Sequence, residues 1–123
     1  MRLADTSVWI DHFRKSDQLL QQTIENDLLL CHPVIVGELA LGSLKSRSSV
    51  LSFLASQKMV QVATHDEIMT MIDTHRLYSM GIGYTDASLL ASALIDDRAE
   101  LWTRDKRLQE AAKKAGARIL TEP

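Results

Sequence analysis

The chain begins with Met1-Arg2-Leu3-Ala4-Asp5-Thr6-Ser7, a short apolar run that ends in an acid and two hydroxyl residues. Short apolar runs bounded by helices are typical of strands in a buried parallel sheet, so residues 2–5 are predicted to form one. In an open parallel sheet, ligands bind in the crevice at the carboxyl ends of the strands. Asp5 is therefore predicted to bring a carboxylate into that crevice.

Similar runs recur along the chain and alternate with segments of helical periodicity. The predicted strands are residues 2–5, 28–31, 59–63, 100–103 and 118–120. The predicted helices are residues 17–26, 34–43, 47–56, 65–80, 86–96 and 105–115. This alternation predicts a single α/β domain over residues 1–123, an α/β/α sandwich with a mainly parallel central sheet of about four to five strands.

Three local signals predict where two of these helices start or end. Thr64 and Glu67 have the spacing of a capping box, which predicts the start of the helix at 65–80. Gly81 is the predicted end of that helix, and Gly116 is predicted to cap the end of the last one.

Composition limits the class of protein. The chain has 123 residues, of which 46% are apolar, so it is large enough to bury a core. Its single cysteine, Cys31, cannot form an internal disulfide, which fits a reducing cytoplasm. No signal peptide is recognisable, and no apolar run approaches the roughly 20 residues of a membrane span. We therefore expect a cytoplasmic protein without a membrane segment.

Charge is distributed unevenly. The net charge is −2, yet residues 98–118 carry seven cations and three anions, a net of +4. A basic C-terminal surface beside an acidic pocket would suit a polyanionic substrate, and a solvated helix surface is the alternative explanation.

Four acids each lie where an apolar strand-like run ends or in the opening of a helix-like run: Asp5, Glu38, Asp86 and Asp105. Carboxylates without nearby cations repel one another, and a divalent metal relieves that repulsion. The pattern predicts metal-dependent phosphoryl chemistry, with cleavage of nucleic acid as the favoured reaction.

Each acid also has an ordinary structural explanation. Helix capping would account for Asp5 and Asp86, although Thr85 could cap in place of Asp86. Glu38 could face solvent between apolar neighbours, and Asp105 could pair with an adjacent cation. The hydroxyls of Thr6, Ser7 and Thr103 could orient a carboxylate that binds metal, or could merely stabilise turns.

Four strings of sequence together resemble the PIN domain, with the closest likeness to the VapC-type toxins of bacterial toxin–antitoxin pairs. They are LADTS with Asp5, VIVGELALG with Glu38, YTDASLLASAL with Asp86 and WTRDKRL with Asp105. The resemblance extends from Met1 to about Thr121. It implies an α/β/α fold and an endoribonuclease dependent on Mg2+ or Mn2+.

The resemblance also implies roles for particular residues. The acidic quartet that holds the metal would be Asp5, Glu38, Asp86 and Asp105, and Thr103 would be the hydroxyl residue near the last acid. It further implies a homodimer, an RNA substrate and a cognate antitoxin whose C-terminal segment lies across the active-site groove.

A mechanism follows as a hypothesis. Asp5 and Asp86 would be the direct metal ligands, with Glu38 and Asp105 completing the site. Arg104, Lys106 and Arg107 would grip neighbouring phosphates, which is a contact independent of sequence.

Two other classes remain open. The first is a catalytically silent PIN-like module that only binds protein. The second is a small phosphatase on a similar sheet, which would usually carry a second acid beside or two residues after the first. Thr6 and Ser7 occupy those positions here.

Overall fold

The computed structural model describes residues 1–123, the whole chain. A three-stranded parallel sheet has the order β2-β1-β3, with register Ala4 opposite Trp102 between β1 and β3. The strands are β1 (Arg2–Ala4), β2 (Leu29–Leu30) and β3 (Glu100–Trp102). The helices are α1 (Thr6–Arg14), α2 (Gln18–Glu25), α3 (Pro33–Ala40), α4 (Arg47–Ala55), α5 (His65–His75), α6 (Tyr84–Ile95) and α7 (Lys106–Ala115).

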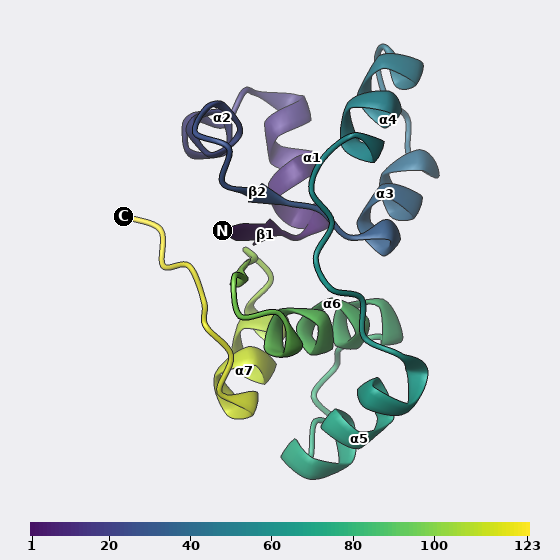
Figure 1. Cartoon of the computed structure of the whole chain (residues 1–123), viewed down its shortest axis with the longest axis vertical. Helices are drawn as coiled ribbons and strands as arrows, with labels where there is room; N and C mark the ends of the chain where they lie inside the picture. The colour runs from purple at the N-terminus through teal and green to yellow at the C-terminus, as the bar shows by residue number, and fades with distance from the viewer.

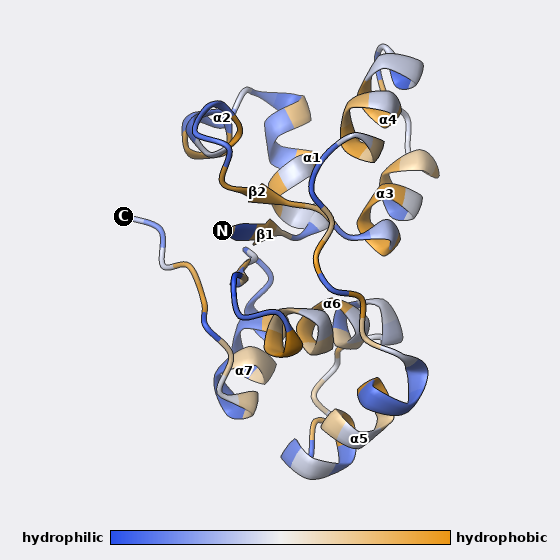
Figure 2. Ribbon diagram, in the orientation of Figure 1, coloured by the Kyte–Doolittle hydropathy of each residue, from blue (hydrophilic) through white to orange (hydrophobic).

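The helices form two layers around the strands. Helices α1 to α4 lie on one side of β1 and β2, and α5 to α7 lie on the other (Figure 1). Figure 2 shows hydrophobic residues along β1 and β2, between the two groups of helices. Leu3, Leu30 and Leu101 are fully buried there. The predicted α/β/α sandwich with a parallel sheet is confirmed.

The sheet has fewer strands than the four to five predicted. The segments 59–63 and 118–120 make only single parallel bridges, Met59 to Cys31 and Ile119 to Leu101. They lie at the two edges of the sheet, beside β2 and β3 respectively. Two edge segments thus take the predicted places without extending into strands.

Side chains of the α6 region satisfy the outer edge of the first edge segment. The Val60 N–H donates to the Cys31 carbonyl at 2.8 Å, which is a sheet contact. The Gln61 N–H instead donates to Asp96 Oδ2 at 2.8 Å, and the Ala63 N–H donates to Ser92 Oγ at 3.0 Å. Since N–H groups alternate sides along an extended segment, those of Gln61 and Ala63 face away from β2, and the two acceptors satisfy this outer edge. Pairing on the β2 side ends because Pro33 begins α3 two residues after Cys31.

Helix boundaries agree with the sequence where the signal is local. The Thr64–Glu67 capping box is confirmed, and Gly116 caps α7 in a left-handed conformation with φ of 76°. The predicted ranges do not include α1, which follows Asp5 directly. Helix α5 ends at His75 rather than at residue 80, because Arg76 turns left-handed with φ of 53°. The next residue, Leu77, is buried, and its N–H donates to the Ile72 carbonyl, which closes the helix end.

Helix α6 is the central helix of its layer. Its residues Ala87–Ala93 are all buried, and it packs against α5, α3 and β3. At 12 residues it is the longest helix, and none of the helices has both the length and the apolar character needed to cross a membrane.

A buried carboxylate closes the turn between α6 and β3. Asp96 is 4% exposed, and its two oxygens accept hydrogen bonds from the Arg98 backbone and guanidinium and from the Gln61 N–H. The Arg98 side chain holds the pKa of Asp96 well below its usual range. This network fastens the edge segment at Gln61 to the end of α6.

Replacing Asp96 with Ala should lower the free energy of unfolding by about 2–3 kcal/mol at neutral pH, because the buried carboxylate and its charged hydrogen bonds are lost. A carboxylate whose pKa is lowered by folding stabilises the folded state at pH values above its unfolded pKa. That stabilisation is lost as the pH falls through the folded pKa. The difference in the free energy of unfolding between Asp96→Ala and the wild type should therefore become smaller below about pH 4. Urea denaturation at several pH values measures both effects. Asp97→Ala, a change at the exposed neighbour, is the control, and equal stability of the two variants would contradict the assignment.

Candidate active site

Asp5 and Thr103 lie side by side directly after the ends of β1 and β3, because the two strands are parallel and in register. Ala4 pairs with Trp102, so the next residue of each strand leaves at the same edge. The Thr103 hydroxyl donates to Asp5 Oδ2 at 2.5 Å, and the Ser7 hydroxyl donates to the same oxygen at 3.0 Å. Asp5 is only 6% exposed, and two hydroxyls fix the position of its carboxylate.

Capping does not explain Asp5. The residue occupies the N-cap position of α1, yet its side chain makes no capping hydrogen bond. Its carboxylate is held instead by hydroxyls that are themselves tied to the loop after β3. Ser7 Oγ accepts from the Arg104 N–H at 3.1 Å, and Thr103 Oγ1 accepts from the Asp105 N–H at 3.1 Å.

Glu38 reaches the same region from α3. Helix α3 packs against α1, and the Thr6 hydroxyl donates to Glu38 Oε1 at 2.7 Å. Glu38 is exposed, as the solvent-facing alternative requires, but its carboxylate is directed to the start of α1 next to Asp5.

Asp86 lies in the first turn of α6 rather than at its start. The helix begins at Tyr84 with Gly83 as its N-cap, so neither Thr85 nor Asp86 occupies the N-cap position, and Asp86 is the third residue of the helix. Asp86 Oδ2 accepts a long hydrogen bond of 3.4 Å from the Gly83 N–H. The helix therefore starts two residues earlier than predicted, and Asp86 is half-buried with its other oxygen unengaged.

The pKa of Asp86 depends on its burial and on the charges of the other three acids. Burial raises its pKa above the usual value, and the Gly83 hydrogen bond opposes that shift. The negative charges of Asp5, Asp105 and Glu38 each raise the pKa further. The four predicted acids are thus electrostatically coupled at one end of the sheet.

Asp105 caps α7. Its Oδ1 accepts from the Arg107 N–H at 2.9 Å and from the Leu108 N–H at 3.3 Å. It makes no ion pair with a neighbouring cation, so the local ion pair considered for it is absent. Asp105 is exposed, and its second oxygen is unengaged.

The same arrangement is repeated in all four acids. One carboxylate oxygen of each accepts a hydrogen bond within the protein, and the other accepts none. The unengaged atoms are Asp5 Oδ1, Glu38 Oε2, Asp86 Oδ1 and Asp105 Oδ2. Each side chain is therefore oriented while keeping one oxygen free for a ligand.

No cation of the protein compensates these charges. None of the four acids forms a salt bridge, whereas Asp17, Asp96 and Glu122 each pair with an arginine. Oxygen-only ligands with excess negative charge suit a hard divalent ion. No three acidic, histidine or cysteine side chains lie close enough together to form a ready-made metal cage, as expected for carboxylates that repel one another.

The structure corrects the role expected of Arg104. Its guanidinium pairs with Asp11 at 2.9 Å, with Glu122 at 2.8 Å and also with Asp17, so it is not available to grip phosphates. Its partners come from α1, the start of α2 and the C-terminal end, which local sequence does not indicate. Lys106 and Arg107 are exposed and make no ion pair.

A buried link between α3 and α6 was missed by sequence reasoning. His32 caps α3 by accepting from the Val34 N–H at Nδ1, and its Nε2 lies 3.0 Å from Ser92 Oγ. Since Nδ1 accepts, Nε2 carries the proton and donates to Ser92. Pro33 was the available signal, because proline is favoured at the first position of a helix, which places His32 at the N-cap.

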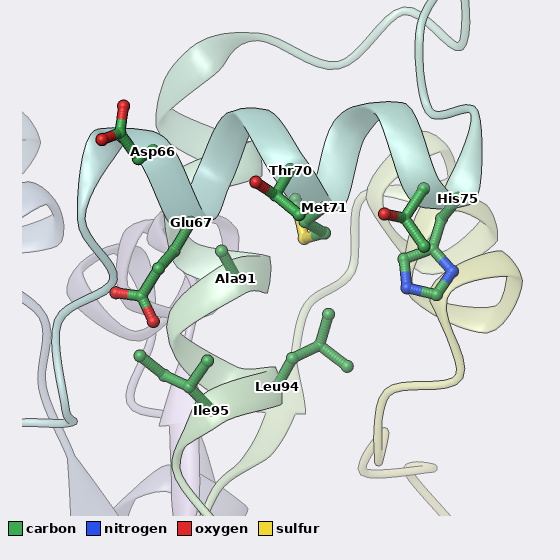
Figure 3. A pocket seen from close by; sticks show the side chains of 9 residues that line it. Asp66, Glu67, Thr70, Met71, His75, Ala91, Leu94 and Ile95 are labelled. Carbon is green, nitrogen blue, oxygen red and sulfur yellow. The ribbon is translucent and has the colours of Figure 1, made fainter.

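The groove between α5 and α6 is separate from the acids. It has a volume of ≈ 390 Å³, and none of the four acids or Thr103 lines it. Figure 3 shows Ala91, Leu94 and Ile95 of α6 facing α5, with Glu67 and His75 near its two ends. Glu67 is already engaged in the capping box.

Comparison with known proteins agrees with this architecture. The family model described as PIN domain matches residues 2–114. Two relatives are each named Ribonuclease VapC32, from Mycobacterium tuberculosis strains CDC 1551 / Oshkosh and ATCC 25618 / H37Rv. Each is 44% identical over 122 residues, which cover 99% of this chain and 98% of the relative. The chain belongs to the PIN-domain family, in its VapC branch.

Proposed function

We propose that the protein is a divalent-metal-dependent endoribonuclease and the toxin of a toxin–antitoxin pair. The observation that carries the proposal is the group of four coupled acids, none paired with a cation and each with one free oxygen. The relatives named Ribonuclease VapC32 support RNA as the substrate.

Asp5, Glu38, Asp86 and Asp105 would hold Mg2+ or Mn2+, since all four offer carboxylate oxygens. When bound, a divalent ion offsets charge on the scissile phosphate and makes water a better nucleophile. The protein itself orients the carboxylates that would bind the ion. Thr103 and Ser7 fix Asp5 through Oδ2, and Thr6 fixes Glu38 through Oε1, so each carboxylate keeps its other oxygen free for the ion. The four side chains would close around the ion when it offsets their repulsion.

Family membership supports further proposals about partners and location. The proposal includes a homodimer, a cognate antitoxin whose C-terminal segment lies across the active-site groove, and action in the cytoplasm. Selectivity would come from the shape of the RNA and from unpaired loops, because double-stranded RNA hides its base edges.

The two other classes receive less support. A silent binding module has no need of four uncompensated acids, which cost stability. A phosphatase would use a second acid near Asp5, whereas the residue two positions on is Ser7, whose hydroxyl is a donor to Asp5 itself.

Asp5→Asn and Asp86→Asn should each reduce RNA cleavage by at least about 100-fold, because each removes a charged metal ligand. The assay uses purified, partner-free protein with total RNA, in Mg2+, in Mn2+ and in chelator. Asp73→Asn, at an exposed position on α5, is the matched control and should cleave normally. Full activity in both site variants would overturn the proposal.

Asp86→Asn should also raise the melting temperature of the metal-free protein at neutral pH. The folded state raises the pKa of Asp86, so this residue stabilises the fold below its unfolded pKa, and that contribution is lost as the pH rises through the folded pKa. At neutral pH the ionised carboxylate is repelled by three acids, and Asn removes that repulsion.

Scanning calorimetry in chelator measures the two melting temperatures. The difference between Asp86→Asn and the wild type should disappear below about pH 4. Added Mg2+ should stabilise the wild type more than Asp86→Asn, because the ligand binds only the intact site. A lower melting temperature for Asp86→Asn in chelator, with Asp73→Asn unchanged, would contradict the coupling.

Thr103→Val should lower the cleavage rate about 10- to 100-fold, the usual effect of losing a group that orients a metal ligand. The change leaves Asp5 Oδ2 with one donor and the Asp105 N–H with no acceptor. Thr103→Ser retains the hydroxyl and should keep most of the activity. Equal rates for Val and Ser would show that the hydroxyl does not position Asp5.

A further inference from the structure

A second groove adjoins the acids at the start of α6. It has a volume of ≈ 210 Å³ and lies between the end of α5, the loop that follows it and the first turn of α6. Gly83 belongs to both features, because it lines this groove and its N–H donates to Asp86. A ligand in the groove would therefore be continuous with the acidic site.

Both tyrosines of the chain line this groove. Tyr78 is 61% exposed and Tyr84 is 52% exposed, whereas the two tryptophans are buried. Ile82 and Leu77 complete its apolar wall. A small cavity walled by exposed aromatic rings is suited to a flat aromatic ligand rather than to a protein helix.

Tyr84 is held in place before any ligand arrives. Its hydroxyl lies 2.7 Å from His65 Nδ1, and the two rings are 5.6 Å apart at an interplanar angle of 39°. The contact connects the first residue of α6 to the first residue of α5. A ring fixed in this way loses little conformational entropy when a base stacks on it.

A free cation lies against the same loop. Gly81 has φ of 79°, and a Cβ built there would lie 3.0 Å from Arg107 Cδ and 3.3 Å from Nε. The Arg107 side chain therefore covers the loop between Tyr78 and Gly83, while its backbone lies two residues from Asp105. Because Arg107 makes no ion pair, it can contact a phosphate near the acids.

We propose that this groove binds one unpaired nucleobase of an RNA, stacked against Tyr78 and Tyr84, with Arg107 on the adjoining phosphate. The inference rests on the proposed function and adds a base-binding site to it. Aromatic rings combined with a cation are how proteins hold single-stranded nucleic acid, since every base has a face to stack. Duplex RNA keeps its bases stacked within the helix and cannot enter such a groove.

Binding of a fluorescein-labelled single-stranded RNA of mixed sequence tests the proposal. The full chain is used in chelator, so the result does not depend on cleavage. Tyr78→Ala and Tyr84→Ala should each weaken binding about 5- to 150-fold, the usual loss for one base–aromatic contact. Tyr84→Phe keeps the ring and should bind within about 3-fold of wild type. Phe53→Ala, a change at an exposed aromatic residue on α4, is the control.

Two further probes identify what the tyrosines contact. An abasic RNA of the same length should bind weakly and equally to wild type and Tyr84→Ala. Arg107→Gln should weaken intact and abasic RNA alike, with a shallower salt dependence by about one phosphate contact. If the tyrosine variants weaken both RNAs equally, or change only the oligomeric mass of the protein, the base-binding site is refuted.

Failure of this inference can be told apart from failure of the nuclease proposal. Tyrosine-dependent binding without cleavage in any metal would support the base-binding site and overturn the nuclease. Metal-dependent cleavage with normal RNA binding by both tyrosine variants would overturn the base-binding site alone.

Discussion

The hydrogen bond from the Thr103 hydroxyl to Asp5 Oδ2 joins the ends of the neighbouring strands β1 and β3, and the rest of the site depends on it. It exists because β1 and β3 are parallel and in register, so both residues leave the sheet at one edge. Thr103 also accepts from the Asp105 N–H, and Ser7 accepts from the Arg104 N–H. The loop after β3 is therefore fastened to the start of α1 through polar contacts that end at one carboxylate.

Like charges are gathered at this edge, and the guanidinium of Arg104 is directed away from it. Arg104 lies between Thr103 and Asp105, yet its guanidinium is held by Asp11, Asp17 and Glu122. Those ion pairs neutralise the arginine away from the quartet. Burial raises the pKa of Asp86, and the charges of the other three acids raise it further. A fold selected only for stability would pair these acids, so their isolation points to a ligand that supplies positive charge.

Local signals in the sequence predicted the parts of the structure that depend on local interactions. The strand-end position of Asp5, the Thr64–Glu67 capping box and the Gly116 cap all involve neighbours in sequence. Some errors were local, such as the missed helix α1 and the left-handed Arg76 that ends α5 early. Others depend on distant parts of the chain. The segment 59–63 pairs only briefly because β2 gives way to α3 at Pro33, and its outer N–H groups are satisfied by Asp96 and Ser92. The ion pairs of Arg104 are likewise long-range, so a basic run in the sequence did not reveal how that cation is used.

Helix α6 connects the chemistry of the site to its proposed selectivity. Tyr84, Gly83 and Asp86 all fall within its first turn, so a base held by the tyrosine is placed at a set distance from the carboxylate. The helix cannot shift freely, because Ser92 on its buried face bonds to His32 and to the Ala63 N–H. His32 in turn caps α3, which carries Glu38. One buried histidine–serine contact thus fixes two of the four acids relative to each other, and the sheet edge fixes the other two.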